Sequence, residues 1–531
     1  MNNKTKVFLP ILLAMAIVLG MYINPFFQQR TGLQSFTMPA TASSHKLDAV
    51  LNMIVDDYVD TVSAERLVEQ AIPAILKNLD PHTVYIPKED LQRINEDLNG
   101  NFGGIGVQYI TYRDTVTVVK AIEGGPSDSA GVLAGDRIVK VDTTPIVGAD
   151  LSTEFIQGKL KGRKGTGVKV QIVRRGVKDL IDLDIIRGSI PVASVDVAYM
   201  INKDLGYIKV DRFGATTYHE FSVGLEKLKE QGLKKLIVDL RGNSGGYMSA
   251  ATNMINEFLP KGKMIVYTEG KSQSKTDYVS TGSGNYQDLP IVVLIDEGSA
   301  SASEIFAGAI QDNDRGEIIG RRSFGKGLVQ EQRSLPDGSA LRLTVARYYT
   351  PTGRCIQKSY SNGKAEYNND ITERFIHGEF EQQDSIHFAD SLKFKTPEGN
   401  IVYGGGGIMP DIFIPVDTAG YSKYFIELNR KGLIHRFAFY YVDEHRAEME
   451  RLLNVKDILN YLDKKPLIKE LTKYCEDAGV KTNNKGLNYS LEIIDTQMKA
   501  YIARNIIDDD GFYPIIQKID KTLDYVIDMK D

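Results

Sequence analysis

The sequence predicts a multidomain protein of the α/β class, with an α+β arrangement overall. Three observations lead to this prediction. After Arg187 the apolar pattern alternates between strands and helices, residues 101–187 are rich in strands alone, and the patterns at both ends of the chain are helical. At 531 residues the chain is also too long for one ordinary core.

Residues 1–30 are predicted to be a signal anchor. An apolar run of residues 7–23 follows Lys4 and Lys6, and it is short for a membrane span but long for a signal-peptide core. No Ala-x-Ala sequence follows closely, so we prefer an uncleaved anchor over a cleaved signal peptide. The two lysines place the N-terminus in the cytoplasm and the body in the periplasm or extracellular space. Residues 31–44, rich in small and polar side chains, are predicted to be a linker.

Residues 45–100 are predicted to form a helical arm. Apolar side chains recur at helical spacing across residues 47–79, which indicates two helices ended by Asp80 and Pro81. Such a stripe packs on its own domain in most proteins.

Residues 101–187 are predicted to be a β-rich domain with strands at 115–119 and 168–173. A glycine-rich stretch precedes these strands, and its backbone N–H groups can bind the terminal carboxylate of a peptide while a strand edge pairs with the peptide backbone. A plain β-rich module with a glycine-rich turn is the alternative. The candidate peptide-binding residues are Gly103, Gly104, Ile105, Gly106 and Val107.

The body of the chain, residues 188–420, is organised around a buried strand at 291–295 and the small-residue loop that follows it. Ser301 lies in this loop, directly before a helical pattern. Free N–H groups at a helix start can hold a developing oxyanion, so Ser301 is the candidate nucleophile.

Lys326 is the candidate base for Ser301. No histidine falls between His219 and His377, and a buried lysine can lose its proton at neutral pH. Lys326 and Gln330 share one face if this segment is a strand, so Gln330 can orient the lysine. Pairs of serine and lysine are known variants of the serine triad.

An oxyanion hole is predicted near Ser301. A glycine-rich turn at residues 239–246 lies between a predicted strand and a predicted helix, where backbone amides are free to bind negative charge. We expect the N–H of Gly245 or Gly246 to act together with that of Ala302. A flexible turn is the alternative.

The same residues also fit other known motifs. Ser301 with Glu304 also fits a helix capping box. The stretch from Gly320 to Lys326 imitates a phosphate-binding loop, but it lacks the required Ser or Thr and would need a strand, loop and helix. Ser323 with Lys326 fits the S-x-x-K of penicillin-binding enzymes, although flanking glycines suit a helix poorly.

The serine loop, the Phe-Gly-Lys-Gly turn and Gln330, taken in this order, resemble the carboxyl-terminal processing proteases, a family of Ser-Lys peptidases also called tail-specific proteases. The glycine-rich stretch, with residues 131–138, resembles a PDZ domain. The resemblance implies a crotonase-like or Clp-protease-like core, and cleavage of proteins near their C-termini by Ser301 and Lys326. It also implies a PDZ domain that captures apolar C-termini and gates access. A helical arm that mediates homodimers or larger homo-oligomers is a further family trait.

Composition excludes several other classes of function. A net charge of −5 gives no basic surface for nucleic acid. The two cysteines and seven histidines show no metal-ligand spacing, so neither a metal nor another cofactor is expected. A disulfide between Cys355 and Cys475 stays open. The charged residues 358–400 are predicted to be an exposed insertion, and residues 421–531 a helical support or dimer contact. A non-enzymatic PDZ scaffold is the main rival function.

Overall fold

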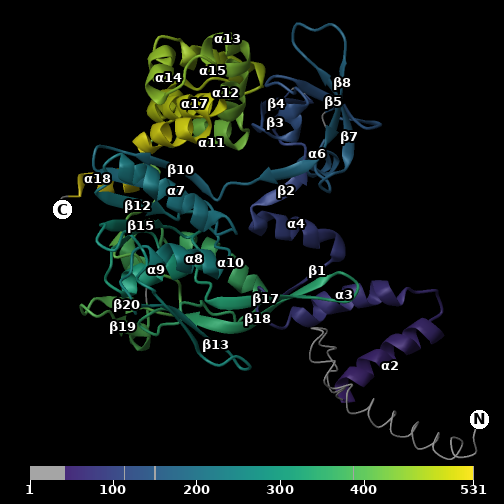
Figure 1. Ribbon diagram of the computed structural model, residues 1–531, viewed down its shortest axis with the longest axis vertical. Coiled ribbons are helices and arrows are strands. Elements are labelled where there is room, and N and C mark those ends of the chain that lie inside the picture. Colours follow the sequence, from purple (N-terminus) through teal and green to yellow (C-terminus); the bar gives the residue numbers. More distant parts are fainter. Residues whose placement is uncertain (1–41, 113, 149–150, 387, 530–531) are drawn as a thin grey trace, which may run out of the picture. The chain divides into compact units, whose positions relative to one another are not determined.

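The structure is a computed structural model that describes residues 42–112, 114–148, 151–386 and 388–529. It divides into two compact units, one ending at Ile75 and one beginning at Leu76 (Figure 1). The described part of the first unit is made of two helices, as the apolar spacing predicted: α2 (Ala42–Asp57) and α3 (Ala64–Leu76). The predicted signal anchor lies outside the described residues. Within the described ranges, no helix is both long enough and apolar enough to cross a membrane.

The β-rich region of the second unit is a six-stranded antiparallel sheet with the order β3-β4-β5-β7-β8, in which β6 pairs with β5. Aliphatic side chains of these strands and of α6 form its core. The strands predicted at residues 115–119 and 168–173 are present. The elements of this region are α4 (Lys88–Asn99), β2 (Asn101–Gly104), β3 (Val107–Tyr112), β4 (Thr115–Ala121), α5 (Pro126–Ser129), β5 (Arg137–Val141), β6 (Thr144–Pro145), α6 (Thr153–Leu160), β7 (Gly167–Val173), β8 (Ile181–Ile186) and β9 (Gly188–Pro191).

The central sheet of the body has six strands in the order β10-β11-β12-β15-β16-β21, parallel except for β10. Its strands are apolar on both sides, because a parallel sheet must be covered on both faces. The strands are β10 (Val195–Met200), β11 (Leu205–Val210), β12 (Lys235–Asp239), β15 (Ile291–Ile295), β16 (Glu317–Gly320) and β21 (Ile412–Phe413).

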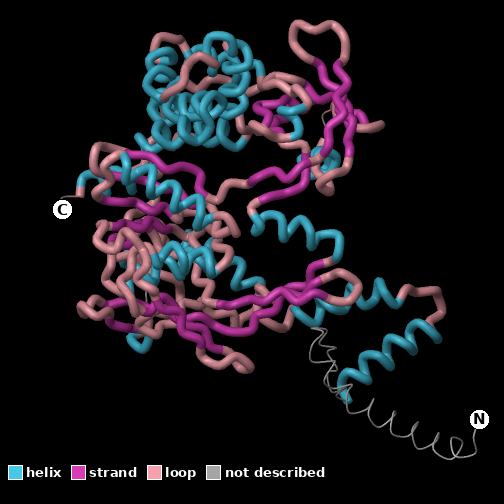
Figure 2. The backbone as a smooth tube through the Cα atoms, in the orientation of Figure 1, coloured by secondary structure: helices cyan, strands magenta, loops and turns pink. Residues whose placement is uncertain are grey.

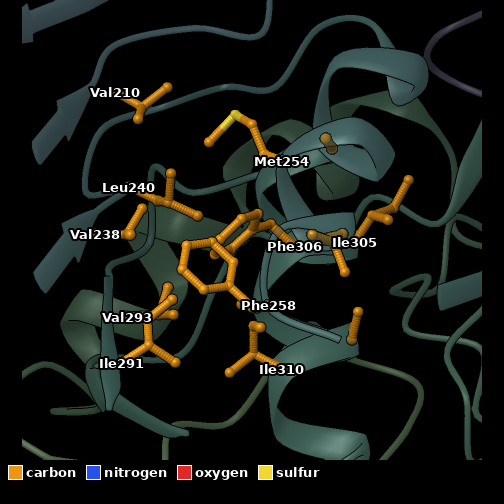
Figure 3. Packing of buried hydrophobic residues seen from close by; sticks show 14 of the residues in the cluster. Val210, Val238, Leu240, Met254, Phe258, Ile291, Val293, Ile305, Phe306 and Ile310 are labelled. Carbon is orange, nitrogen blue, oxygen red and sulfur yellow. The ribbon is translucent and has the colours of Figure 1, made fainter. Parts of the chain in front are cut away.

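Three helices cover one face of the central sheet: α7 (Thr217–Glu230), α8 (Met248–Asn256) and α9 (Ala302–Asp312). Figure 3 shows strand side chains such as Val238 and Val293 directed toward Phe258 and Phe306. The two phenylalanine rings pack edge to face, with centroids 6.3 Å apart. This packing fixes the start of α9, where Ser301 lies.

A second sheet lies beside the active-site elements, with the order β1-β18-β13-β14 and with β17 paired to β18. Its strands are β1 (Val84–Ile86), β13 (Met264–Glu269), β14 (Thr276–Val279), β17 (Leu328–Ser334) and β18 (Ala340–Tyr349). The following segment contains α10 (Lys364–Ile376), η1 (Gln383–Ser385), η2 (Asp390–Leu392), β19 (Lys393–Lys395) and β20 (Ile401–Tyr403). The prediction of an exposed insertion at 358–400 was therefore wrong in part, because α10 packs against the loop that carries Lys326, as described below.

The C-terminal region is helical, as predicted (Figure 2). Most of its helices share a core of their own. They are α11 (Lys423–Arg430), α12 (Leu433–Glu444), α13 (Arg446–Met449), α14 (Val455–Leu462), α15 (Leu467–Asp477), α16 (Asn484–Tyr489), α17 (Leu491–Ile516), η3 (Gln517–Ile519) and α18 (Lys521–Asp528). The domain boundaries given above stay a prediction.

Candidate active site

Ser301 lies at the turn between β15 and α9, where the sequence placed it. Its φ of 56° and ψ of −111° lie in the left-handed half of backbone space, which a residue with a Cβ rarely occupies. Such strain persists only where the surroundings fix the conformation. A strained turn from strand to helix is also how α/β-hydrolases expose a nucleophilic serine.

The buried carboxylate of Glu304 fixes this turn. Its Oε2 accepts hydrogen bonds from the N–H groups of Ser301 (2.8 Å) and Lys326 (2.9 Å). Its Oε1 accepts from the hydroxyl of Ser323 (2.5 Å) and the N–H of Gly325 (2.7 Å). Burial raises the pKa of Glu304 to about 7. The four hydrogen-bond donors act in the opposite direction, because they favour the ionised form. One side chain thus joins the serine loop to the lysine loop, a role that goes beyond the predicted capping box.

Lys326 is largely buried in the loop before β17. Burial lowers the pKa of its ammonium, and the nearby positive charge of Arg342 lowers it further, while Glu304 and Asp80 act in the opposite direction. A lysine with a lowered pKa is suited to act as a base.

Gln330 contacts Lys326 as predicted, although the local backbone differs from the prediction. Lys326 precedes β17 rather than lying in it, and a register shift separates Val329 from Gln330. The Lys326 ammonium still donates to Gln330 Oε1 at 3.3 Å. The bulge and the loop therefore bring together two side chains that were expected on one face of a regular strand.

His82 orients Gln330 through its backbone carbonyl, a contact that the sequence did not predict. Gln330 Nε2 donates to the His82 carbonyl at 2.6 Å, so Oε1 is left to face Lys326. Asp80 holds this segment by accepting from the N–H groups of His82 and Thr83. Burial, followed by the charge of Lys326, lowers the pKa of His82 to about 4, so its ring is neutral at neutral pH. The sequence signal nearest to this segment was the helix end at Asp80 and Pro81.

Ser301 and Lys326 line the same cavity, of about 420 Å³. Among the described residues, the hydrogen-bond partner of the Lys326 ammonium is Gln330 rather than the Ser301 hydroxyl. Catalytic hydrogen bonds commonly close only once substrate is bound. The remaining lining residues are Asn95, Leu98, Ser244, Gly245, Gly246, Tyr247, Met248, Ile305, Leu328, Val329, Gln330, Gln332, Arg342 and Tyr348.

The glycine-rich turn lies directly against Ser301. A Cβ on Gly245, whose φ is +102°, would stand 2.7 Å from the Cβ of Ser301 and 2.7 Å from the carbonyl oxygen of Ala300, so only glycine fits this approach. The Gly245 N–H donates to Asn243 Oδ1 at 2.8 Å and is thus occupied. Of the two amides expected in the turn, that of Gly246 is the better candidate donor beside Ala302.

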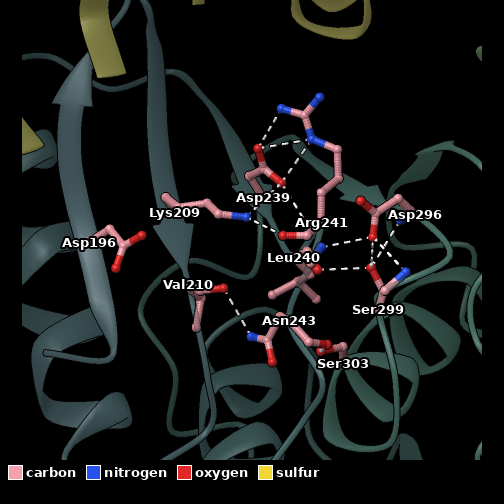
Figure 4. A network of polar contacts seen from close by, with 12 residues as sticks. Asp196, Lys209, Val210, Asp239, Leu240, Arg241, Asn243, Asp296, Ser299 and Ser303 are labelled. Atoms are coloured by element: carbon pink, nitrogen blue, oxygen red, sulfur yellow. Dashed lines mark hydrogen bonds and ion pairs between the residues drawn. The ribbon is translucent and has the colours of Figure 1, made fainter. Parts of the chain in front are cut away.

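Several hydrogen bonds cross-link this turn to the serine loop, as Figure 4 shows. The Gly242 N–H donates to Asp296 Oδ1 (2.8 Å), and the hydroxyl of Ser299 donates to the carbonyl of Leu240 (2.8 Å). The hydroxyl of Ser303 donates to the Asn243 carbonyl at 2.8 Å. The turn and the nucleophile are therefore held as one rigid assembly.

The segment after β18 packs on the loop that carries Lys326. The buried Lys358 ammonium lies 4.0 Å from the centroid of the Phe324 ring and pairs with Asp370 of α10 at 2.8 Å. Arg374 of α10 donates to the carbonyl of Ser323. The prediction of an exposed insertion was wrong for these residues, because the Lys358 and Arg374 side chains are buried and paired, while much of the rest of the segment is exposed.

The predicted peptide-binding stretch of the β-rich domain is divided between two strands and a turn. Gly103 and Gly104 lie in β2 and pair with β9, and Val107 begins β3. Between them, the carbonyls of Ile105 and Gly106 accept from backbone N–H groups of residues 127 and 122.

The structure agrees with the sequence against a phosphate-binding loop, because the stretch from Gly320 to Lys326 leads into strand β17 and not into a helix. Cys355 and Cys475 are both free thiols. Within the part of the chain that the structure describes, no three His, Cys, Asp or Glu side chains are grouped to hold a metal ion.

Comparisons with known proteins found matches to three parts of the chain. A model of peptidase family S41 matches residues 204–364, a PDZ domain model matches residues 103–185, and a family of unknown function matches residues 424–508. The carboxy-terminal-processing protease of Bartonella bacilliformis is 38% identical over 313 residues, which are 58% of this chain and 71% of that protein. The carboxy-terminal processing protease CtpA of Bacillus subtilis is 33% identical over 361 residues, 67% of this chain and 76% of that protein.

Among solved structures, a photosystem II D1 C-terminal processing protease aligns with 71% of this chain and 94% of its own, at 25% identity and a TM-score of 0.37. The sequence matches define the class of this protein, which is a peptidase with a PDZ domain. The chain belongs to peptidase family S41, among the carboxy-terminal processing proteases.

Proposed function

We propose that this protein is a serine endopeptidase that cleaves proteins near their C-termini, with Ser301 as nucleophile and Lys326 as base. The observation that carries the proposal is the shared cavity of these two residues, whose loops are both held by Glu304. The relatives are named carboxy-terminal processing proteases, which supports the proposal that cleavage occurs near the C-terminus of the substrate.

The arrangement supports a two-step acyl transfer. The Ser301 hydroxyl attacks the peptide carbonyl while the neutral amine of Lys326 takes its proton. The amides of Gly246 and Ala302 stabilise the oxyanion, and losing one such donor costs about 3 kcal/mol of transition-state stabilisation. Lys326 then gives the proton to the leaving amine, and water hydrolyses the acyl-enzyme with Lys326 again as base. Gln330 orients Lys326 throughout.

Substrate capture is assigned to the PDZ domain. A strand edge and the backbone around residues 103–107 would receive an apolar C-terminus and control its access to the cavity. The apolar run of residues 7–23 after two lysines supports an anchor in the cytoplasmic membrane, with the body outside the cytoplasm. A homodimer or larger homo-oligomer would be built through the helical arm.

The test of the proposal is cleavage of an unstructured polypeptide by the full-length protein, with products identified by mass spectrometry. Ser301→Ala is expected to reduce kcat by roughly 10³-fold or more, because the nucleophile is lost. Ser334→Ala, at the exposed end of β17, is the matched control and should cleave like the wild type. Equal cleavage by the wild type and Ser301→Ala would overturn the proposal.

Arg342→Gln is expected to move the acid limb of the pH profile of kcat/KM to higher pH. Arg342 lines the cavity, and its positive charge lowers the pKa of Lys326. Without that charge the pKa of the ammonium rises, so a higher pH is needed to produce the neutral base. Arg333→Gln, on the exposed part of β17, should leave the limb in place. An unmoved limb in Arg342→Gln would contradict this role.

A further inference from the structure

The last described helix of the chain, α18, packs on one face of the central sheet. Leu523 and Val526 of α18 are buried in a cluster with side chains from the face of the sheet opposite α7, α8 and α9. The strand residues of this cluster are Val197, Leu205, Tyr207, Ile237, Val292, Leu294 and Ile319. By its packing, α18 therefore belongs to the sheet that carries the candidate active site.

Asp520, at the start of α18, also contacts the active-site framework directly. Its carboxylate caps the helix by accepting from the N–H groups of Thr522 (3.0 Å) and Leu523 (3.1 Å). It also accepts two hydrogen bonds from Arg241, with Nη1 at 3.1 Å from Oδ1 and Nη2 at 2.7 Å from Oδ2. Both side chains of this pair are 20% exposed, so the contact is largely shielded from water. A two-point pair of this kind fixes both distance and orientation.

Arg241 lies in the glycine-rich turn that supplies the candidate oxyanion amide, two residues after the end of β12 at Asp239. Its guanidinium also binds the buried carboxylate of Asp239, and its carbonyl accepts from the ammonium of Lys209. Burial alone would raise the pKa of Asp239, but the charges of Arg241 and Lys209 hold it well below its usual range. Arg241 is thus held between one carboxylate of the sheet and one carboxylate of the C-terminal helix.

We propose that Asp520 is a positioning residue for peptide cleavage. By holding Arg241, it fixes the turn of residues 241–246 against the loop of Ser301, so that the C-terminal end of the described chain takes part in forming the oxyanion hole. This inference rests on the function proposed above. It assigns a task to a segment that lies outside the S41 match of residues 204–364.

Asp520→Asn in the full-length protein tests the inference, because asparagine caps a helix as well as aspartate but lacks the charge that Arg241 binds. We expect kcat to fall about 10-fold, less than the loss of a whole oxyanion donor, with KM changed by less than about twofold. The affinity for a peptide aldehyde, whose adduct with Ser301 needs the oxyanion hole, should fall by a similar factor. The affinity for the matching peptide alcohol should stay unchanged.

Two controls separate positioning from general destabilisation. Asp524→Asn changes a half-exposed carboxylate on the same helix and should leave kcat at the wild-type value. In an Arg241→Gln background, Asp520→Asn should have no further effect on kcat, because the ion pair between residues 520 and 241 is already absent. A wild-type kcat in Asp520→Asn, an equal loss in Asp524→Asn, or an additive loss in the double variant would each overturn the inference. Ser301→Ala in the same assay keeps the outcomes distinct, because its full activity would overturn the proposed function instead.

Discussion

Replacing Lys326 with arginine is expected to abolish cleavage as completely as replacing it with alanine, with kcat reduced by roughly 10³-fold or more in both variants. Arginine keeps the positive charge and much of the length of lysine, but its guanidinium does not lose a proton in proteins. The proposed base is the neutral amine, whose formation is favoured because burial lowers the pKa of Lys326. The measurement is kcat and KM for an unstructured polypeptide, with thermal unfolding recorded for each variant.

Lys271→Arg, at an exposed position after β13, is the matched control and should behave like the wild type. Retention of cleavage by Lys326→Arg would contradict the assignment, since it would mean that the site needs a cation and not a base. Loss of activity together with loss of the folded state would be recognised from the unfolding curve, and Lys326→Met, which is apolar and of similar length, would then replace alanine in the comparison.

Glu304→Ala is expected to lower both the stability and the activity of the protein. The change leaves four donors without their acceptor in the interior: the hydroxyl of Ser323 and the N–H groups of Ser301, Gly325 and Lys326. An unsatisfied buried donor costs about 1–3 kcal/mol, so we expect the free energy of unfolding to fall by roughly 4 kcal/mol or more. Because both catalytic loops lose their common anchor, kcat should also fall by at least about 10²-fold at a temperature where the variant is folded.

Denaturant unfolding measures the first effect and steady-state cleavage the second. Glu317→Gln, at an exposed position of β16, should change the free energy of unfolding by less than about 0.5 kcal/mol. If Glu304→Ala unfolded at the wild-type denaturant concentration, the carboxylate would not be the anchor that its four contacts indicate.

The parts of the site that could be predicted from sequence are those set by local patterns. The buried strand at 291–295, the turn at Ser301 and the helix after it follow from periodicity and small residues over a short stretch. The contact between Lys326 and Gln330 was also predicted, although a register shift rather than simple alternation produces it.

The parts that could not be predicted depend on contacts between distant residues. Glu304 has a local signature as a capping residue, but its bonds to Ser323, Gly325 and Lys326 need the folded chain. The carbonyl of His82 accepts from Gln330, which is 248 positions away in the sequence. Because every residue has a backbone carbonyl, the residue types do not indicate which one will be this acceptor. The charged composition of residues 358–400 predicted exposure, which is wrong for Lys358, since its ammonium is buried against aromatic rings and paired with a carboxylate.

The cover that α18 gives to the central sheet has a consequence for the order of events during synthesis. Strands β10 to β16 leave the ribosome long before residues 521–528, so the part of the sheet face that packs on Leu523 and Val526 stays uncovered until α18 has been made. Until then the sheet lacks its contacts with α18, and contacts between residues so far apart in sequence form late. The native packing of this part of the sheet therefore forms only after residues 521–528 have been made.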